Sequence, residues 1–275
     1  MAESPVAFLG PEGTFAHLVA QKRFHGKNKL VPLPTIDEVF DFVAGKPSAR
    51  GIVPIENSSG GTIYDTIDRL VDHTDVLIEE ALSLNVRLAL LGKSKENLRV
   101  IYSHFAPLHH CEPWIDRHFP GVEVREVSST AKALITAAEE PGAAAIGNRQ
   151  ASGIYKLKIL EFPIEQDIPN VTQFLLLGHR TGSSEAESRT TLAVTLPNAP
   201  GSLCDFLQPF KDNQINLTRI ISRPIVGKPN SYVFLVDLKG AMKSKGVSKA
   251  LAMAKPACAS LRLLGSYPVR KSYSS

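Results

Sequence analysis

The sequence contains few cysteines and no long apolar run. Only three cysteines occur among 275 residues, and none belongs to a CxxC pair or a Cys/His cluster. Their number and spacing argue against a disulfide framework and against a zinc site. No apolar run approaches the length that spans a bilayer, and the chain does not open on a basic stretch followed by an apolar one. We therefore expect a cytoplasmic protein that does not contact a membrane.

An excess of charge of one sign is also missing. Lys and Arg number 31 against 27 Asp and Glu, a net charge of +4 without any long block of one sign. This balance does not predict a nucleic-acid-binding protein, although it is compatible with sites for small anions. Hydrophobic residues make up 43% of the chain, which is a globular composition, and the length fits one large domain or two ordinary ones.

The first 179 residues alternate short apolar runs with amphipathic segments. We predict the runs as strands: Val6–Gly10, Gly51–Ile55, Val86–Gly92, Arg99–His104, Ala143–Gly147 and Thr172–Gly178. A helix is predicted after Thr35, which forms a capping box with Glu38. Strands and helices in alternation predict an α/β domain over residues 1–179.

The order of elements changes after a polar linker at 180–189. The linker has no large apolar residue. Residues 190–275 then read as strand, helix, two strands, helix and strand. This βαββαβ order predicts a ferredoxin-like second domain.

Polar turns follow several of the predicted strands. The segments are Gly10–Thr14, Glu56–Thr62, Ser103-His104 and Ser128–Thr130. In open α/β sheets ligands bind beyond the carboxyl ends of strands, so these turns could line one cleft. Each segment taken alone is equally consistent with a capped or solvated turn. His17, His109 and His110 are interpreted as surface or cleft-edge histidines, and Cys111 as a packed apolar residue.

Taken in order, these segments resemble the prephenate dehydratase family. The family's Gly-Pro-Glu-Gly-Thr-Phe stands at residues 10–15 and its Val-Pro-Ile-Glu-Asn-Ser at residues 53–58. Ser103-His104, Ser129-Thr130-Ala131 and Ala144-Ala145-Ile146 also match in order and spacing. The C-terminal region resembles the family's ACT regulatory domain, with an effector loop at residues 200–203 and an effector strand at residues 216–224.

The resemblance implies a two-lobed catalytic domain, built like a type II periplasmic binding protein, followed by the ACT domain. It implies the conversion of prephenate to phenylpyruvate with loss of water and carbon dioxide and without a cofactor or metal. Thr172, from the family's Thr-Arg-Phe motif, is the catalytic candidate. The substrate-binding candidates are Thr14, Asn57, Ser58, Ser103, Ser129, Thr130, Gln173 and Phe174.

The resemblance also implies regulation and assembly. Phenylalanine is the expected effector, and a homodimer or homotetramer is the expected assembly. The effector-binding candidates are Gly201, Ser202, Leu203, Asn216, Ser222 and Arg223.

The sequence departs from the family at three places. Gln173 stands where the motif has arginine, Phe105-Ala106 replaces Pro-Gln after Ser103-His104, and Ile221 stands where the effector strand commonly has Glu. Glutamine lacks the charge and the bidentate fork that suit a carboxylate. Alternatives to the dehydratase are therefore a prephenate decarboxylase that retains the ring hydroxyl, a catalytically inactive amino-acid sensor, or a dehydratase that takes arogenate.

Overall fold

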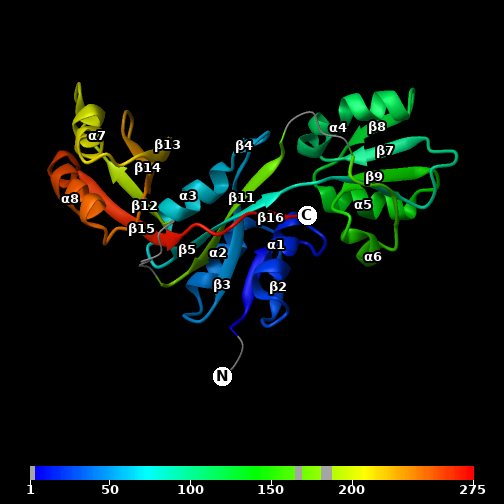
Figure 1. The fold of residues 1–275 in the computed structure, drawn as a ribbon, viewed down its shortest axis with the longest axis horizontal. Coiled ribbons are helices and arrows are strands. Elements are labelled where there is room, and N and C mark those ends of the chain that lie inside the picture. The colour runs from blue at the N-terminus through cyan, green and yellow to red at the C-terminus, as the bar shows by residue number, and fades with distance from the viewer. Residues whose placement is uncertain (1–3, 165–168, 181–187) are drawn as a thin grey trace.

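The computed structural model describes residues 4–164, 169–180 and 188–275, which form three sheet-based units in a row (Figure 1). Lobe 1 lies in the centre, lobe 2 on one side and the C-terminal domain on the other. Of the linker predicted at 180–189, residues 181–187 lie outside the described residues. In the part of the chain that is described, no helix is long and apolar enough to cross a membrane.

Lobe 1 is a mixed sheet with three helices. Its strands have the order β16-β5-β11-β3-β1-β2, and β4 pairs with β3. The strands are β1 (Val6–Leu9), β2 (Leu30–Leu33), β3 (Arg50–Asn57), β4 (Gly61–Thr62), β5 (Leu77–Asn85), β11 (Val171–Gly178) and β16 (Tyr273–Ser274). The helices are α1 (Phe15–Phe24), α2 (Ile36–Ala44) and α3 (Tyr64–Asp72). The predicted N-cap of α2 is confirmed, because Thr35 Oγ1 accepts a bond from the Glu38 amide, and the Glu38 carboxylate accepts from the Thr35 hydroxyl at 3.3 Å.

Lobe 2 carries a smaller sheet of order β10-β6-β9-β7-β8. Its strands are β6 (Ala89–Gly92), β7 (Val100–Ser103), β8 (Glu123–Glu126), β9 (Ala143–Gly147) and β10 (Lys158–Glu161). Its helices are α4 (Phe105–His118), α5 (Thr130–Glu139) and α6 (Ala151–Tyr155). The predicted run at 86–92 becomes a strand only from Ala89, and the longer strand β5 just before it was not predicted.

The C-terminal domain has the predicted βαββαβ order. It contains β12 (Ser188–Thr195), α7 (Ser202–Asp212), β13 (Leu217–Pro224), β14 (Tyr232–Lys239), α8 (Lys245–Ala254), a 3-10 turn (Lys255–Ala257) and β15 (Ser260–Pro268). The sheet order is β13-β14-β12-β15. Helices α7 and α8 cover one face of this sheet with an apolar core of their own. The two-lobed α/β architecture with a ferredoxin-like second domain is confirmed.

Two apolar cores join the three units. One core combines lobe 1 residues with lobe 2 residues such as Ile101, Trp114 and Ile146. The other combines lobe 1 residues with Leu235 and Leu264 of the C-terminal domain. Strand β15 approaches β5 so closely that a Cβ on Gly265 would lie 2.5 Å from the Ile78 carbonyl oxygen. The open face of the C-terminal sheet is therefore packed on lobe 1.

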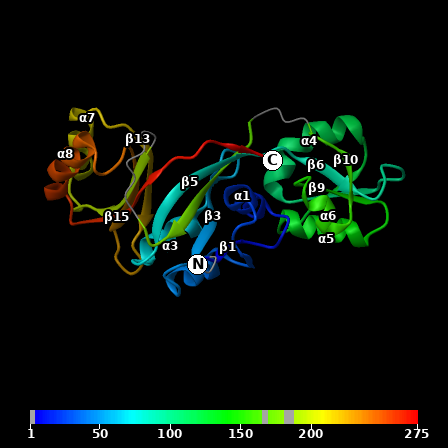
Figure 2. The ribbon, with the colours of Figure 1, turned by 60° about the horizontal axis from the view of Figure 1, so that its bottom comes forward.

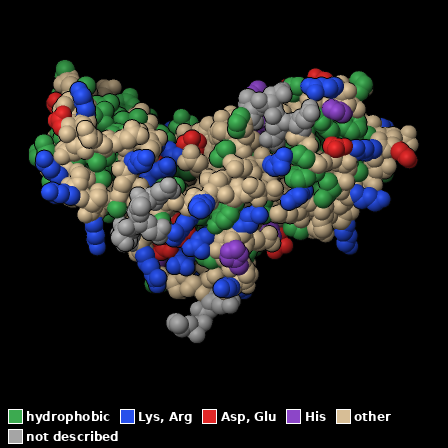
Figure 3. All heavy atoms as spheres, in the orientation of Figure 1, with side chains coloured by type: hydrophobic (Ala, Val, Ile, Leu, Met, Phe, Trp, Pro, Cys, Tyr) green, Lys and Arg blue, Asp and Glu red, His purple; other side chains and the backbone are tan. Residues whose placement is uncertain are grey.

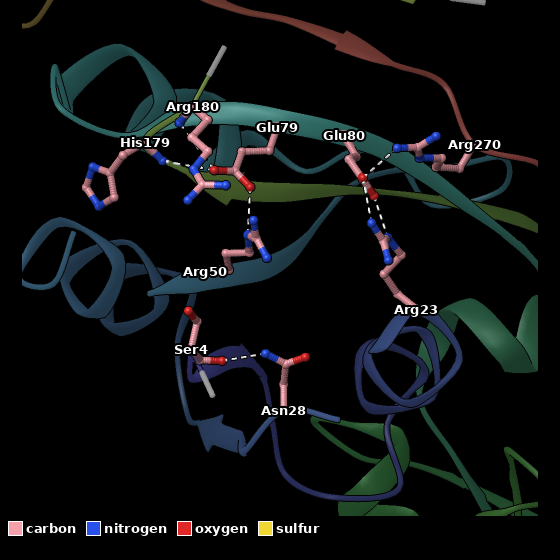
Figure 4. A network of polar contacts seen from close by, with 9 residues as sticks. All are labelled: Ser4, Arg23, Asn28, Arg50, Glu79, Glu80, His179, Arg180 and Arg270. Atoms are coloured by element: carbon pink, nitrogen blue, oxygen red, sulfur yellow. Dashed lines mark hydrogen bonds and ion pairs between the residues drawn. The ribbon is translucent and has the colours of Figure 1, made fainter. Parts of the chain in front are cut away.

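The chain after β15 returns to lobe 1, and both ribbon views show it running along β5 (Figures 1 and 2). Strand β16 pairs in parallel with β5, with Tyr273 opposite Leu84. Arg270 of this segment donates to Glu80 at 2.9 Å, and Arg23 of α1 donates to the same carboxylate at 2.6 and 2.7 Å (Figure 4). Burial alone would raise the pKa of Glu80, but the bonds from both arginines outweigh it and hold that pKa below its usual value.

Charged side chains of both signs are spread over the face of the molecule drawn in Figure 3. On the face drawn in Figure 3, Lys and Arg side chains lie on all three units, with Asp and Glu between them. This distribution agrees with the small net charge of the sequence.

Candidate active site

The side-chain amide of Asn57 is fully hydrogen-bonded at the end of β3. Its oxygen accepts from the backbone amides of Ser59 at 3.0 Å and Gly60 at 2.8 Å, which is an Asx turn. Its nitrogen donates to Asn170 Oδ1 and to Thr172 Oγ1, both at 2.9 Å. Two backbone donors on the oxygen fix which end of the amide is which. The turn therefore aims an N–H donor at the Thr172 hydroxyl.

The Thr172 hydroxyl receives that bond and keeps its own hydrogen. Thr172 is only 9% exposed, and in the described part of the chain no acceptor takes its hydroxyl hydrogen. A bond donated to an oxygen stabilises negative charge on it and makes its O–H a better donor. The pair therefore presents one polarised hydroxyl that can donate to a third group.

A second contact holds the turn against β11. Ser58 Oγ donates to the Pro169 carbonyl at 2.9 Å and accepts from the Val171 amide at 2.9 Å. The backbone of Ser58 also donates to the Val171 carbonyl at 2.9 Å. The register of β3 and β11 is thereby fixed with Thr172 directly opposite Asn57. Sequence reasoning placed these two residues at one site, and the structure brings them together.

Lobe 2 reaches the same turn through His110. Ser59 Oγ and His110 Nε2 are hydrogen-bonded, His110 is 3% exposed, and its Nδ1 has no partner among the described residues. Burial, and then the charge of His109, lower the pKa of His110, so its ring is neutral at pH 7. The interpretation of His110 as a surface histidine was wrong, and the cleft-edge alternative stays a prediction. The helical spacing of the apolar residues in α4 could have revealed the burial of His110, because His110 lies next to Cys111 on the buried face of that helix.

His17 and Cys111 are both buried. His17 is 7% exposed, stacks on Phe8 with ring centroids 4.8 Å apart, and its Nδ1 accepts from the Gly13 amide at 3.0 Å. Its interpretation as a surface histidine was also wrong. The apolar role predicted for Cys111 is confirmed, because the residue is fully buried and burial raises the pKa of its thiol to about 12.

Four predicted substrate contacts have local roles in the structure. Thr14 and Ser129 cap α1 and α5, and Ser103 donates to the His104 carbonyl at 2.9 Å. Thr130 begins α5. The hydroxyls of Thr14, Ser103 and Ser129 bond to nearby backbone, and no side-chain bond joins the four residues to Asn57 or Thr172 within the described ranges. These contacts agree with capped turns, and the substrate-binding role of the four residues stays a prediction.

The side chains of Gln173 and Phe174 lie apart from the hydrogen bonds around Thr172. Phe174 and Leu176 belong to the core shared with lobe 2. By the alternation of a strand Thr172 lies on the same face of β11, and Gln173 lies on the opposite face. Phe174 is 2% exposed within that core. Gln173 Oε1 accepts from Arg219 Nη2 of the C-terminal domain at 3.1 Å. The substrate-binding role of both residues stays a prediction.

The predicted effector residues lie on two elements of the C-terminal domain. Gly201, with φ of +85°, precedes α7, Ser202 begins that helix and Leu203 packs on the domain core. Asn216 accepts the Lys239 amide at 2.8 Å and Ser222 is exposed on β13. Arg223 pairs with Asp68 of α3 at 2.6 Å, and Ile221 packs against the core shared with lobe 1. The Ile221 departure therefore lies at the contact between the domains.

Comparison with known proteins identifies the family. The prephenate dehydratase family model matches residues 6–182, and the ACT domain model matches residues 190–252. A bifunctional chorismate mutase/prephenate dehydratase of Pseudomonas aeruginosa is 37% identical over 96% of this chain and 73% of its own length. The solved prephenate dehydratase of Arthrobacter aurescens, in complex with L-Phe, is 28% identical with a TM-score of 0.87, covering 96% of this chain and 90% of that one.

One further solved structure shares the fold alone. It is described as a quorum quenching acylase and is 23% identical, with a TM-score of 0.87 over 97% of this chain and 98% of that one. At this identity the likeness carries no functional argument. The matched family models and the 37% identical relative show that the chain belongs to the prephenate dehydratase family, with an ACT domain at its C-terminal end.

Proposed function

We propose that the chain catalyses the reaction of its family at the Asn57–Thr172 pair. Prephenate loses its ring carboxylate as carbon dioxide, and the electron pair of that bond enters the ring. The ring hydroxyl leaves from the opposite carbon with the C–O electron pair and takes up a proton as water, which yields phenylpyruvate. Departing hydroxide needs a hydrogen-bond donor, and the Thr172 hydroxyl is the donor that the site provides.

The observation that carries this proposal is the bonding of Asn57. All four hydrogen-bonding positions of its amide are used, so its N–H is fixed on the Thr172 oxygen. A threonine hydroxyl is a weak acid when free. Its role here is to donate an oriented hydrogen bond and to relay a proton rather than to exist as an anion. The neutral His110, held by Ser59, adds a buried ring nitrogen from lobe 2 at the same turn.

The alternatives lose support from the position of Gln173. Two changes point to a decarboxylase that keeps the ring hydroxyl: Ala106 and the replacement of the motif's arginine by Gln173. That side chain bonds to Arg219 on the face of β11 away from Thr172. The glutamine at position 173 therefore leaves the Thr172 hydroxyl and its bond to Asn57 unaltered. The ordered Asn57–Thr172 pair is likewise not needed by a protein that only senses amino acids.

Regulation, assembly and location complete the proposal. Phenylalanine binds the ACT domain as the effector, supported by the domain match and by the L-Phe complex of the relative from Arthrobacter aurescens. The active form is a homodimer or homotetramer, and the protein acts in the cytoplasm, as expected for the family.

The test is proton NMR of the purified protein with prephenate at neutral pH, beside an enzyme-free control. Aromatic phenylpyruvate signals that grow faster than in the control are expected. Olefinic signals of a hydroxylated dihydro ring would establish the decarboxylase instead. Unchanged prephenate together with turnover of arogenate would reassign the substrate, and no turnover of either would leave the sensor.

A further inference from the structure

A guanidinium of the ACT domain lies directly behind the candidate active site. Arg219, on β13, is 9% exposed. Its Nη2 donates to Glu56 Oε2 at 2.7 Å and to Gln173 Oε1 at 3.1 Å, and its Nε donates to the same Glu56 oxygen at 3.2 Å. Arg219 therefore bonds to side chains of both β3 and β11.

The two residues that Arg219 holds are the neighbours of the catalytic pair. Gln173 lies opposite Glu56 in the register of β11 and β3, and Thr172 lies opposite Asn57 one step further along. Because consecutive residues of a strand face opposite sides, Arg219 fixes the sheet from behind while Asn57 and Thr172 face the lobe junction. A shift of either strand at Glu56 or Gln173 changes the distance between Asn57 and Thr172.

Arg219 is anchored within its own domain. Its Nη1 donates to Asp237 Oδ2 at 2.7 Å, and Asp237 is fully buried. Thr191 Oγ1 donates to the other oxygen of Asp237 at 2.6 Å and also bonds to Tyr267 at 2.6 Å. Burial alone would lower the pKa of Arg219, but the charges of Asp237 and Glu56 outweigh it and raise that pKa. The guanidinium stays charged and moves with the sheet of the ACT domain.

Two other arginines of the ACT domain contact helix α3. Arg223 pairs with Asp68, and Arg262 donates to backbone carbonyls at the end of the helix, including that of Leu70 at 2.9 Å. Neither arginine contacts Glu56 or Gln173 in the described structure. Among these three arginines, Arg219 is the one whose bonds reach β3 and β11 beside the catalytic pair.

We propose that Arg219 is a positioning residue supplied to the active site by the ACT domain. By holding Glu56 and Gln173 it sets the spacing of Asn57 and Thr172, and movement of β13 when phenylalanine binds changes that spacing. Gln173 fits this arrangement because its carbonyl oxygen accepts from the guanidinium, whereas an arginine there would oppose it with a like charge. This inference rests on the function proposed above.

The experiment compares the full-length protein with three variants. The double variant Arg219→Met/Asp237→Asn removes the guanidinium without leaving its buried partner charged. Arg219→Lys keeps the charge but loses the fork. Arg262→Met is the control, because it removes a contact between the same domains away from the catalytic strands. The readouts are kcat and KM for prephenate, the response to phenylalanine, and hydrogen exchange of segments 53–60 and 170–178.

The double variant is expected to lose roughly 10- to 100-fold in kcat, with KM changed less than about twofold. It is also expected to lose the response to phenylalanine and to exchange faster in both segments, while Arg219→Lys recovers part of each. Arg262→Met keeps the wild-type values in all three readouts. A folded double variant with wild-type kcat, phenylalanine response and exchange in both segments overturns the proposal. If the wild-type protein does not turn over prephenate, the proposed function fails, and the exchange comparison still decides whether Arg219 orders the two strands.

Discussion

Replacing Thr172 by valine tests the central hydrogen bond of the proposed site. Valine keeps the branched shape and removes the hydroxyl, so one N–H of Asn57 loses its acceptor while the bond to Asn170 remains. Loss of one such partner at a largely buried position costs about 1–2 kcal/mol in the free energy of unfolding. A positioned proton donor contributes roughly 10²- to 10⁴-fold to a rate. We therefore expect Thr172→Val to remain folded and to lose at least about 100-fold in kcat.

The matched control is Thr66→Val on helix α3. Thr66 is fully buried and its hydroxyl donates to the Pro54 carbonyl at 2.6 Å. Pro54, like Asn57, is part of β3, so Thr66→Val removes a comparable threonine bond to the same strand. We expect a similar loss in the free energy of unfolding, measured in urea, with kcat within about twofold of wild type. Phenylpyruvate formation from prephenate is measured for both variants and for Thr172→Ser, which restores the hydroxyl. A Thr172→Val variant with activity close to that of Thr66→Val would refute the role assigned to Thr172.

Three other predictions concern stability, measured by urea unfolding at several pH values. The pKa of His110 is lowered, so below the ordinary histidine value of 6.5 the native state binds fewer protons than the unfolded chain. Stability therefore decreases as the pH falls through that range. His110→Gln should remove this part of the acid sensitivity, and an unchanged pH dependence contradicts the assignment. Glu80 has a lowered pKa and arginine partners about one-third exposed (32% and 34%), so Glu80→Gln should cost about 1–2 kcal/mol at pH 7, and the loss should shrink as acid protonates the wild-type carboxylate. A loss that is equal at all pH values would show that the charge of Glu80 is not involved. Gly265→Ala should cost about 1–3 kcal/mol, because its Cβ meets β5 at 2.5 Å, whereas Gly153→Ala, with open space around it, should be neutral or stabilising by up to about 1 kcal/mol. Equal stability of these two alanine variants would contradict the close packing of β15 on β5.

The sequence alone predicted the elements whose signals are local. Apolar runs identified β1, β3, β7, β9 and β11, and the capping residue Thr35 identified the start of α2. The βαββαβ order identified the C-terminal domain. Strand β5 was missed because Glu79 and Glu80 interrupt its apolar pattern. Their carboxylates are acceptable there because Arg50, Arg23 and Arg270 come from distant segments (Figure 4).

Only the tertiary structure decided which side chains share the site. Asn57 and Thr172 are 115 positions apart, and a bulge leaves Ile55 of β3 without a partner on β11. A one-residue shift of this kind moves every following side chain to the other face of the sheet. Simple alternation along β3 would put Asn57 on the side of Ile55, away from lobe 2. The sequence specifies the residue types at the site. Which face of the sheet Asn57 and Gln173 occupy depends on the register of the strands, and long-range packing sets that register.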